Sequence, residues 1–305
     1  MKKNRSSRLE ARQLRKGRIA LIFMIPALAA VALFMVYPIV YSVFLAFFDW
    51  DGVSAVRKLV GLDNFRRLVN DGFFWRALIN TSMISVVAFV FQVFLGLVIA
   101  YCIVRIMTVG KGLYVLFYLV PTVVSEIAIA LLWSFIYNPY FGIINSFLNS
   151  VGLSGMARGW LGDPATAFPA VINAMNLTYL GLYIVLFVAA IQDIPETIFD
   201  AAAIDGAGHA RSFFSVTVPM MWDNIRSALL LCAVFSFKTF TLVYVLTQGG
   251  PSHSSEVLST YLFKSGFNAF DMGYASAIAC AQLIVTVAIG FILVKTSGHG
   301  GAHTA

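Results

Sequence analysis

Charged residues are scarce in this chain of 305 residues: 11% are Asp, Glu, Lys or Arg, whereas 60% are hydrophobic. A soluble globular domain carries about 25% charged residues, so the deficit excludes a solvated enzyme, a disordered protein or a nucleic-acid-binding domain as the first interpretation. The mean hydropathy of +0.85 instead indicates a polytopic membrane domain, because each bilayer-spanning helix needs about 20 apolar residues.

Cysteine is also rare, and its three residues, Cys102, Cys232 and Cys280, all lie within apolar stretches. Their number is odd, and no Cys-x-x-Cys or other metal-ligand spacing occurs. This pattern excludes a disulfide framework and predicts small packing residues. The four histidines are scattered among loops and the tail, so the sequence predicts neither a metal site nor a catalytic triad.

Apolar residues gather in six segments, each long enough to cross the bilayer. We predict an all-α membrane protein with spans at 19–48, 77–104, 113–137, 166–191, 224–247 and 272–294. The first segment is too long for the apolar region of a cleavable signal peptide, so we interpret it as an uncleaved signal anchor. Leu62, Phe65, Leu68 and Val69 recur at helical spacing after it, which predicts a short interfacial helix.

The excess positive charge precedes the first span. Residues 1–18 hold eight basic side chains and one acidic side chain, which accounts for the whole net charge of +7. With this basic arm in the cytoplasm, the inner segments carry 13 Lys and Arg and the outer segments carry 7. The positive-inside rule therefore predicts cytoplasmic N- and C-termini. The transmembrane domain then covers 19–295, and a flexible Gly-rich tail follows at 296–305.

One connection, at 192–223, differs from the others. Pro195 suits a first helical position, and three alanines that favour a helix follow Asp200. Gly206 permits a left-handed residue and a sharp turn, and a second apolar-periodic stretch ends at Pro219. We predict a short helix, a glycine corner and a second short helix. On these grounds alone it is either a plain connecting hairpin or a surface that another protein approaches closely.

The stretch from Asp200 to Pro219 reads D-A-A-A-I-D-G-A-(x)11-P. It resembles the EAA loop of binding-protein-dependent ABC transporter permeases, with Asp200 where Glu is usual. Further segments resemble the sugar branch of that family, the maltose- and glycerol-3-phosphate-type subunits: Gly61–Phe65, Asn80-Thr81, Tyr244–Pro251 and Phe270–Ala277. The Leu-Thr-x-Gly-Gly-Pro element is more similar to the first of the two permease subunits, and the resemblance runs from about residue 19 to 295.

The resemblance implies the type I ABC importer permease fold in the cytoplasmic (inner) membrane of a bacterium or archaeon. It implies a second homologous permease, an extracytoplasmic solute-binding protein and two ATPase subunits that dock on the coupling loop. Within that loop it implies five coupling residues, namely Asp200, Ala201, Ala202, Asp205 and Gly206.

No cofactor is expected in this chain. Its nearest approach to a phosphate-binding loop, Gly110-Lys111-Gly112, has Arg105 where the first glycine should stand and Gly112 where Ser or Thr is required. ATP and Mg²⁺ are therefore expected on the partner ATPase.

Polar groups inside spans are costly and point to function. Glu126 and Lys238 are the full charges placed near the middle of predicted spans. They either line an aqueous path or pair with each other to hold two helices together.

The fourth predicted span is the most polar. Asn176, Tyr179 and Tyr183 recur at i, i+3 and i+7, which places them on one helix face. Amide and aromatic groups suit a sugar, although they equally serve hydrogen bonds between helices. In the resembled family the helices that flank the coupling loop line the sugar path, which adds Ser236, Lys238 and Thr239.

The sequence therefore predicts the permease subunit of an ABC importer, a transport subunit rather than an enzyme. Its solute would be a sugar, an oligosaccharide or a glycerol-phosphate-like compound, moved by alternating access that a separate ATPase drives. Two alternatives stay open: an ATP-independent carrier or channel, and an intramembrane enzyme in which Glu126 and Lys238 are the reactive groups.

Overall fold

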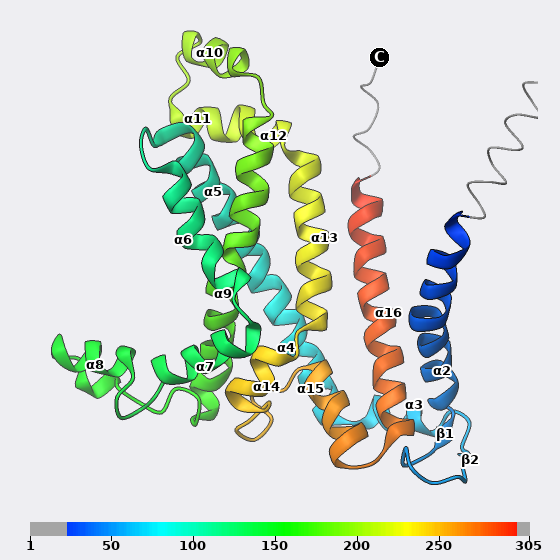
Figure 1. Ribbon diagram of the computed structural model, residues 1–305. Helices are drawn as coiled ribbons and strands as arrows, with labels where there is room; N and C mark the ends of the chain where they lie inside the picture. The colour runs from blue at the N-terminus through cyan, green and yellow to red at the C-terminus, as the bar shows by residue number, and fades with distance from the viewer. Residues whose placement is uncertain (1–22, 298–305) are drawn as a thin grey trace, which may run out of the picture.

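The computed structural model describes residues 23–297 and is a bundle of long helices (Figure 1). The basic arm predicted at 1–18 lies outside these residues, as do positions 298–305 of the predicted tail. Four helices are long and apolar enough to cross a membrane: Phe23–Leu45, Gly72–Ile106, Pro164–Gln192 and Met272–Lys295. They coincide with four of the six predicted spans.

The long helices carry short π-helical stretches, and their element bounds are as follows. The first span contains η1 (Ala32–Val36) and α2 (Tyr37–Leu45). The second span consists of α4 (Gly72–Ala88), η2 (Phe89–Leu95), α5 (Gly96–Tyr101) and η3 (Cys102–Ile106). The remaining two spans are α9 (Pro164–Gln192) and α16 (Met272–Ser297).

The third predicted span is not one straight helix. It consists of α6 (Lys111–Val123) and α7 (Glu126–Ile136), which meet at 99°. Val124 and Ser125 between them have extended backbones, with ψ of 150° and 131°. Pro121 lies inside α6, and Ser125 and Glu126 open α7, so the sequence holds signals for a break that the prediction of one span at 113–137 did not use.

The fifth predicted span, 224–247, is also divided. Helix α13 (Trp222–Lys238) ends where Thr239 turns extended, with ψ of 129°, and α14 (Thr241–Thr247) begins two residues later. A 74° bend separates α13 from the preceding helical segment His209–Met220. The described residues thus hold four long spans, or six if each bent pair crosses the membrane as one.

Close backbone contact fixes the broken span against α9. A side chain at Gly181 would place its Cβ 1.9 Å from the carbonyl oxygen of Tyr118, so only glycine lets α6 and α9 approach this closely. The hydroxyl of Thr122 donates to the carbonyl oxygen of Thr178 at 2.8 Å. The α6–α7 break is therefore anchored directly on α9.

The two ends of the bundle carry different connections (Figure 1). At one end lie α10 (Glu196–Ile204), α11 (His209–Ser212), η5 (Phe213–Thr217) and α12 (Val218–Met220). At the opposite end lie the hairpin β1 (Phe48–Asp49) and β2 (Lys58–Leu59), α3 (Asp63–Asn70), α8 (Ile143–Ser150), η4 (Ser154–Met156), α15 (Leu258–Phe263) and η6 (Lys264–Asn268). The strands pair antiparallel, with Phe48 opposite Leu59. Helix α3 matches the predicted interfacial helix.

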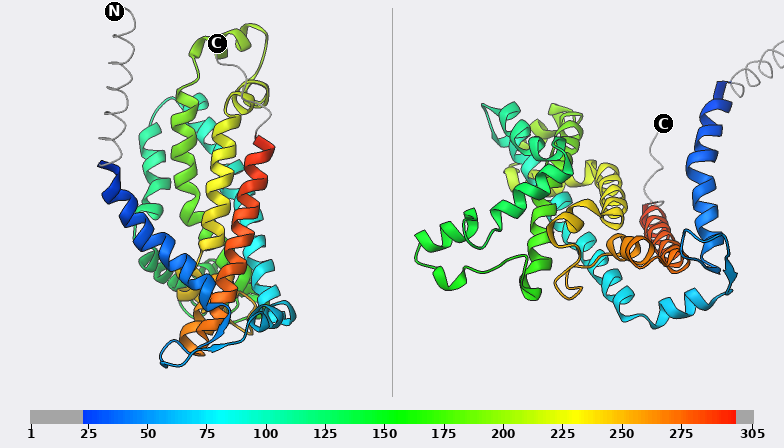
Figure 2. Two further views of the ribbon diagram at one scale, coloured as in Figure 1. Left: turned by 90° about the vertical axis from the view of Figure 1, so that its right-hand side faces the viewer. Right: turned by 60° about the horizontal axis from the view of Figure 1, so that its bottom comes forward.

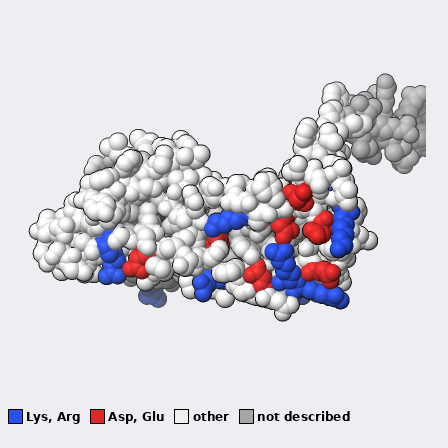
Figure 3. Space-filling model, turned by 90° about the horizontal axis from the view of Figure 1, so that it is seen from below, with Lys and Arg blue, Asp and Glu red and all other residues white. Residues whose placement is uncertain are grey.

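The first span lies at the edge of the bundle, where its α2 part meets α16 (Figure 2). The start of this span and the end of α16 both lie toward the α10 end (Figure 1). Seen from the opposite end, acidic and basic side chains are intermixed rather than separated into patches of one sign (Figure 3).

A buried carboxylate organises the loop after α14. Glu256 is fully buried and accepts hydrogen bonds from Lys264 Nζ at 2.6 Å and from the Thr260 hydroxyl at 2.6 Å. The Asn80 amide donates to the carbonyl oxygens of Ser254 and Glu256, at 3.0 and 2.9 Å. The loop is therefore tied to the start of the second span.

A second carboxylate joins that start to α15 and α16. Asp71 accepts hydrogen bonds from the hydroxyls of Tyr261 and Tyr274 and from the backbone N–H of Phe73. Burial alone would raise the pKa of Asp71, but these hydrogen bonds outweigh it and hold the pKa below its ordinary value of 3.8.

Candidate transport cavity and coupling loop

A cavity of about 320 Å³ lies where α9, α13 and the α6–α7 break meet. Its lining mixes aromatic, amide, hydroxyl and charged groups, from Gln92, Thr122, Glu126, Met175, Tyr179, Leu182, Tyr183, Phe235, Ser236, Lys238, Thr239, Phe240 and Thr241. Six of the seven residues predicted for a substrate path, all except Asn176, are in this set. The chain break at 239–240 contributes Thr239 and Phe240 to the lining, and the break at 124–125 lies between the lining residues Thr122 and Glu126.

The predicted polar face of α9 is present. Tyr179 and Tyr183 line the cavity, whereas Asn176 is buried behind its wall. Asn176 Oδ1 accepts a hydrogen bond from Gln92 Nε2 at 3.1 Å. Asn176 therefore orients Gln92, and Gln92 presents the amide to the cavity.

The two charges on the cavity wall do not form an ion pair with each other. Glu126 Oε1 accepts a hydrogen bond from the Tyr179 hydroxyl at 2.7 Å. Among residues 23–297, no ion pair joins Glu126 to Lys238, which is exposed at the last position of α13. This geometry favours the path-lining interpretation over the pairing interpretation.

Tyr183 brings a hydroxyl with unused hydrogen-bonding capacity. The residue is 1% exposed, and its hydroxyl has no hydrogen-bond partner of standard geometry within the described part of the chain. The Cys232 thiol is a neighbouring polar group. Burying a hydroxyl without a partner costs free energy, so a ligand or water that bonds to it is favoured.

The sequence analysis did not single out Gln92 or Thr122. Gln92 is an amide in the middle of the second span, where polar side chains are expensive. That signal alone could have identified it. Thr122 gave no comparable signal, because its position next to a chain break depends on the fold.

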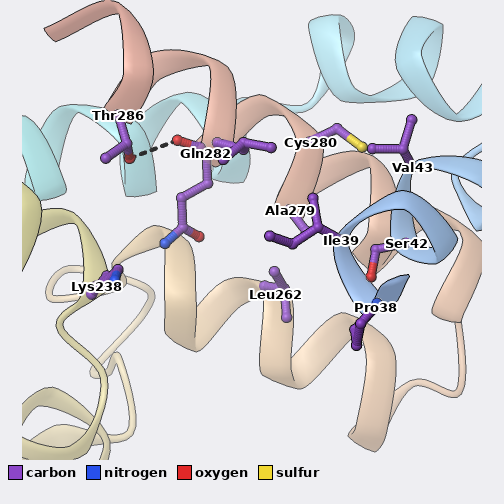
Figure 4. Close-up of a pocket in the computed structure, with 11 residues that line it drawn as sticks. Pro38, Ile39, Ser42, Val43, Lys238, Leu262, Ala279, Cys280, Gln282 and Thr286 are labelled. Atoms are coloured by element: carbon purple, nitrogen blue, oxygen red, sulfur yellow. Dashed lines mark hydrogen bonds between the residues drawn. The ribbon is translucent and has the colours of Figure 1, made fainter. Parts of the chain in front are cut away.

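A second cavity, of about 370 Å³, lies between the first span and α16 (Figure 4). Its walls are mostly aliphatic, with side chains such as Ile39, Val43 and Leu283, and Lys238 also reaches it. These walls offer few groups to a hydroxyl-rich solute, so we place the candidate site in the cavity at α9 and α13.

The coupling loop has the predicted helix–corner–helix form. Gly206 adopts φ of +80°. The N–H groups of Gly206 and Ala207 donate to the carbonyl oxygens of Ala203 and Ala202, at 3.0 and 2.9 Å, which closes the end of α10. Asp205 is the last residue before the corner. The left-handed turn therefore sets the angle between α10 and α11.

Helix α10 exposes most of its surface. Asp200 and Ala201 are exposed, and Ala202 is half-buried. Asp200 lies in the middle of α10 and caps no helix end. Two details differ from prediction: Pro195 precedes the helix, with Glu196 as its first residue, and the second helical stretch passes through Pro219 to Met220. Proline is tolerated there because it is near the start of α12.

Comparison with known proteins gives a consistent family. Residues 92–296 match the family described as "Binding-protein-dependent transport system inner membrane component". The chain is similar to the probable ABC transporter permease protein YurN of Bacillus subtilis, at 38% identity over 91% of this chain and 95% of that protein. It is similar to the diacetylchitobiose uptake system permease protein NgcF of Streptomyces coelicolor, at 31% identity over 97% of this chain and 88% of that protein.

A solved structure shares the fold. It is that of a bacterial alginate ABC transporter in complex with an alginate pentasaccharide-bound periplasmic protein. The match has a TM-score of 0.82 at 20% identity and covers 94% of this chain and 96% of that chain. With the family match over two thirds of its length, this chain belongs to the inner-membrane components of binding-protein-dependent transport systems, the ABC importer permeases.

Proposed function

We propose that this permease subunit imports a sugar or oligosaccharide through the cavity at α9 and α13, and that α10 receives the drive from a separate ATPase. One observation carries the proposal: the two helices that flank the coupling loop, α9 and α13, also form the walls of the polar cavity. Movement imposed on the loop therefore reaches the cavity through continuous helices.

The cavity chemistry supports a hydroxyl-rich solute. Its volume lies at the lower end of the range for small-molecule sites, about 300–1,000 Å³. The rings of Tyr179 and Phe240 offer flat apolar faces, and Gln92 offers both a donor and an acceptor. The names of relatives with oligosaccharide substrates agree with this chemistry.

The same proposal includes the partners and the membrane orientation. The α10 end faces the cytoplasm and docks two ATPase subunits, which hold ATP and Mg²⁺. The opposite end receives a solute-binding protein, and a second permease completes the path across the inner membrane. The periplasmic protein in the similar alginate transporter complex supports the contact with a solute-binding protein.

The test is solute uptake into proteoliposomes that contain the complete complex, with a panel of labelled sugars, oligosaccharides and glycerol phosphates. We expect uptake to require ATP, the binding protein and this chain, and the solute to be recovered unchanged. Uptake without ATP would establish a carrier or channel. A chemically altered product that is lost in the Glu126→Gln, Lys238→Met double variant would establish an intramembrane enzyme.

A further inference from the structure

The end of the second span is fastened to the coupling helix by one arginine. Arg105 Nη1 lies 2.7 and 2.6 Å from the two carboxylate oxygens of Glu196, the first residue of α10. The guanidinium also stands over the ring of Phe199, 3.9 Å from its centroid. A second contact lies beside it, where the Tyr101 hydroxyl donates to the carbonyl oxygen of His209 at 3.0 Å.

The arginine is well placed to hold this contact. Its side chain is 21% exposed, whereas that of Glu196 is 68% exposed. Phe199 is the buried side chain of α10, at 4% exposure. A guanidinium that binds a carboxylate and stacks on an aromatic ring fixes the direction of a helix, which a flexible ammonium does less well.

The contact joins segments that the chain itself does not connect. Arg105 and Glu196 are 91 positions apart, and the coupling loop is covalently continuous with α9 and α13 rather than with the second span. The second span nevertheless supplies Gln92 to the cavity. Gln92 stands 13 residues before Arg105, about 20 Å along a helix that rises about 1.5 Å per residue.

We propose that Arg105, Glu196 and Phe199 form a latch that transmits movement of α10 to the second span and thereby to Gln92. Arg105 is a positioning residue in this proposal, because it acts through its contacts with Glu196 and Phe199. Without the latch, α10 still docks and still moves α9, but the wall that carries Gln92 follows less closely, because only its packing on α9 and the Tyr101 contacts then guide it. This inference rests on the proposed import function and adds a third moving wall to it.

The measurement is solute uptake per ATP hydrolysed in proteoliposomes with the complete complex. We expect Arg105→Gln to keep assembly and ATP hydrolysis, while solute uptake per ATP falls about fivefold or more. Fivefold is about the smallest effect that one coupled site typically has on another. Arg105→Lys, which keeps the charge but loses the planar fork, should give a smaller loss. The exchange Arg105→Glu with Glu196→Arg should recover a large part of the ratio lost in each single variant.

Lys111 provides a control at the same end of the second span. Its Nζ donates to the carbonyl oxygen of Val104 at 2.7 Å, so this contact joins α6 to the second span and does not involve α10. Lys111→Gln should leave uptake per ATP unchanged. The latch is refuted if uptake per ATP in Arg105→Gln equals that of the wild type, if the exchange recovers nothing, or if Lys111→Gln shows an equal loss. Absence of ATP-driven uptake in the wild-type complex would instead refute the import function itself.

Discussion

The corner at Gly206 allows a quantitative test of the coupling loop. Gly206 has φ of +80°, and a Cβ at this position would meet no atom within 4 Å. Substitution therefore has a conformational cost and no steric one. The left-handed region costs about 1–2 kcal/mol for an ordinary L-residue, and a β-branched side chain is a stronger outlier there.

This cost translates into a change in the population of the native corner. A destabilisation of about 1–2 kcal/mol reduces the ratio of native to alternative conformations by about 5- to 30-fold. We expect Gly206→Ala to reduce ATP-driven uptake, Gly206→Val to block it with the subunit still inserted, and Gly206→Asn to retain most of it, because Asn tolerates the left-handed region.

Gly208 is the internal control for this series. It also lies in open space, but its φ is −71°, which any L-residue adopts. Gly208→Ala should therefore transport like the wild type. The measurement is solute uptake in proteoliposomes by each variant, normalised to the amount of assembled complex. Normal uptake by Gly206→Val, or an equal loss in Gly208→Ala, would refute the reasoning.

Three further perturbations follow from particular contacts. Gly181→Val places a side chain against the Tyr118 carbonyl, so we expect α6 and α9 to separate and the melting temperature in detergent to fall, with a cost of at least about 1–3 kcal/mol; an unchanged melting temperature would contradict the close contact. Asp71→Asn weakens the hydrogen bonds from Tyr261 and should lower the melting temperature at pH 7. Because the folded pKa of Asp71 lies below 3.8, the stabilisation from its carboxylate is present above pH 3.8 and is lost as the pH falls through the folded pKa. The melting temperatures of the wild type and the variant should therefore converge in acid. Ile204 is 86% exposed at the tip of α10, so Ile204→Asp should leave the permease folded but reduce ATPase binding in a co-purification assay, and unaltered binding would exclude a contact there.

Local chemistry made several features predictable from the sequence. Apolar length located four spans, and the three-alanine run with Gly206 specified the helix and corner of the coupling loop. The i, i+3, i+7 spacing placed Tyr179 and Tyr183 on one face, because the unbroken helix α9 preserves its own periodicity.

Features set by distant partners were not predictable in this way. Pro121 signals a bend near Val124 and Ser125, but the direction of that break depends on how α6 packs against α9. The contact of Arg105 with Glu196 joins residues from separate parts of the chain. No single-sequence pattern indicates which polar side chains meet across such separations.

The central claim is that α10 receives its drive from a separate ATPase. The most direct measurement is to purify the tagged chain from its native host in mild detergent, identify the co-purifying proteins and assay vanadate-sensitive ATP hydrolysis. The account predicts a second permease and an ATPase, with hydrolysis stimulated by a solute-binding protein and lost together with the ATPase when α10 carries Ile204→Asp. A chain that purifies alone, hydrolyses no ATP and still passes solute in liposomes would contradict it.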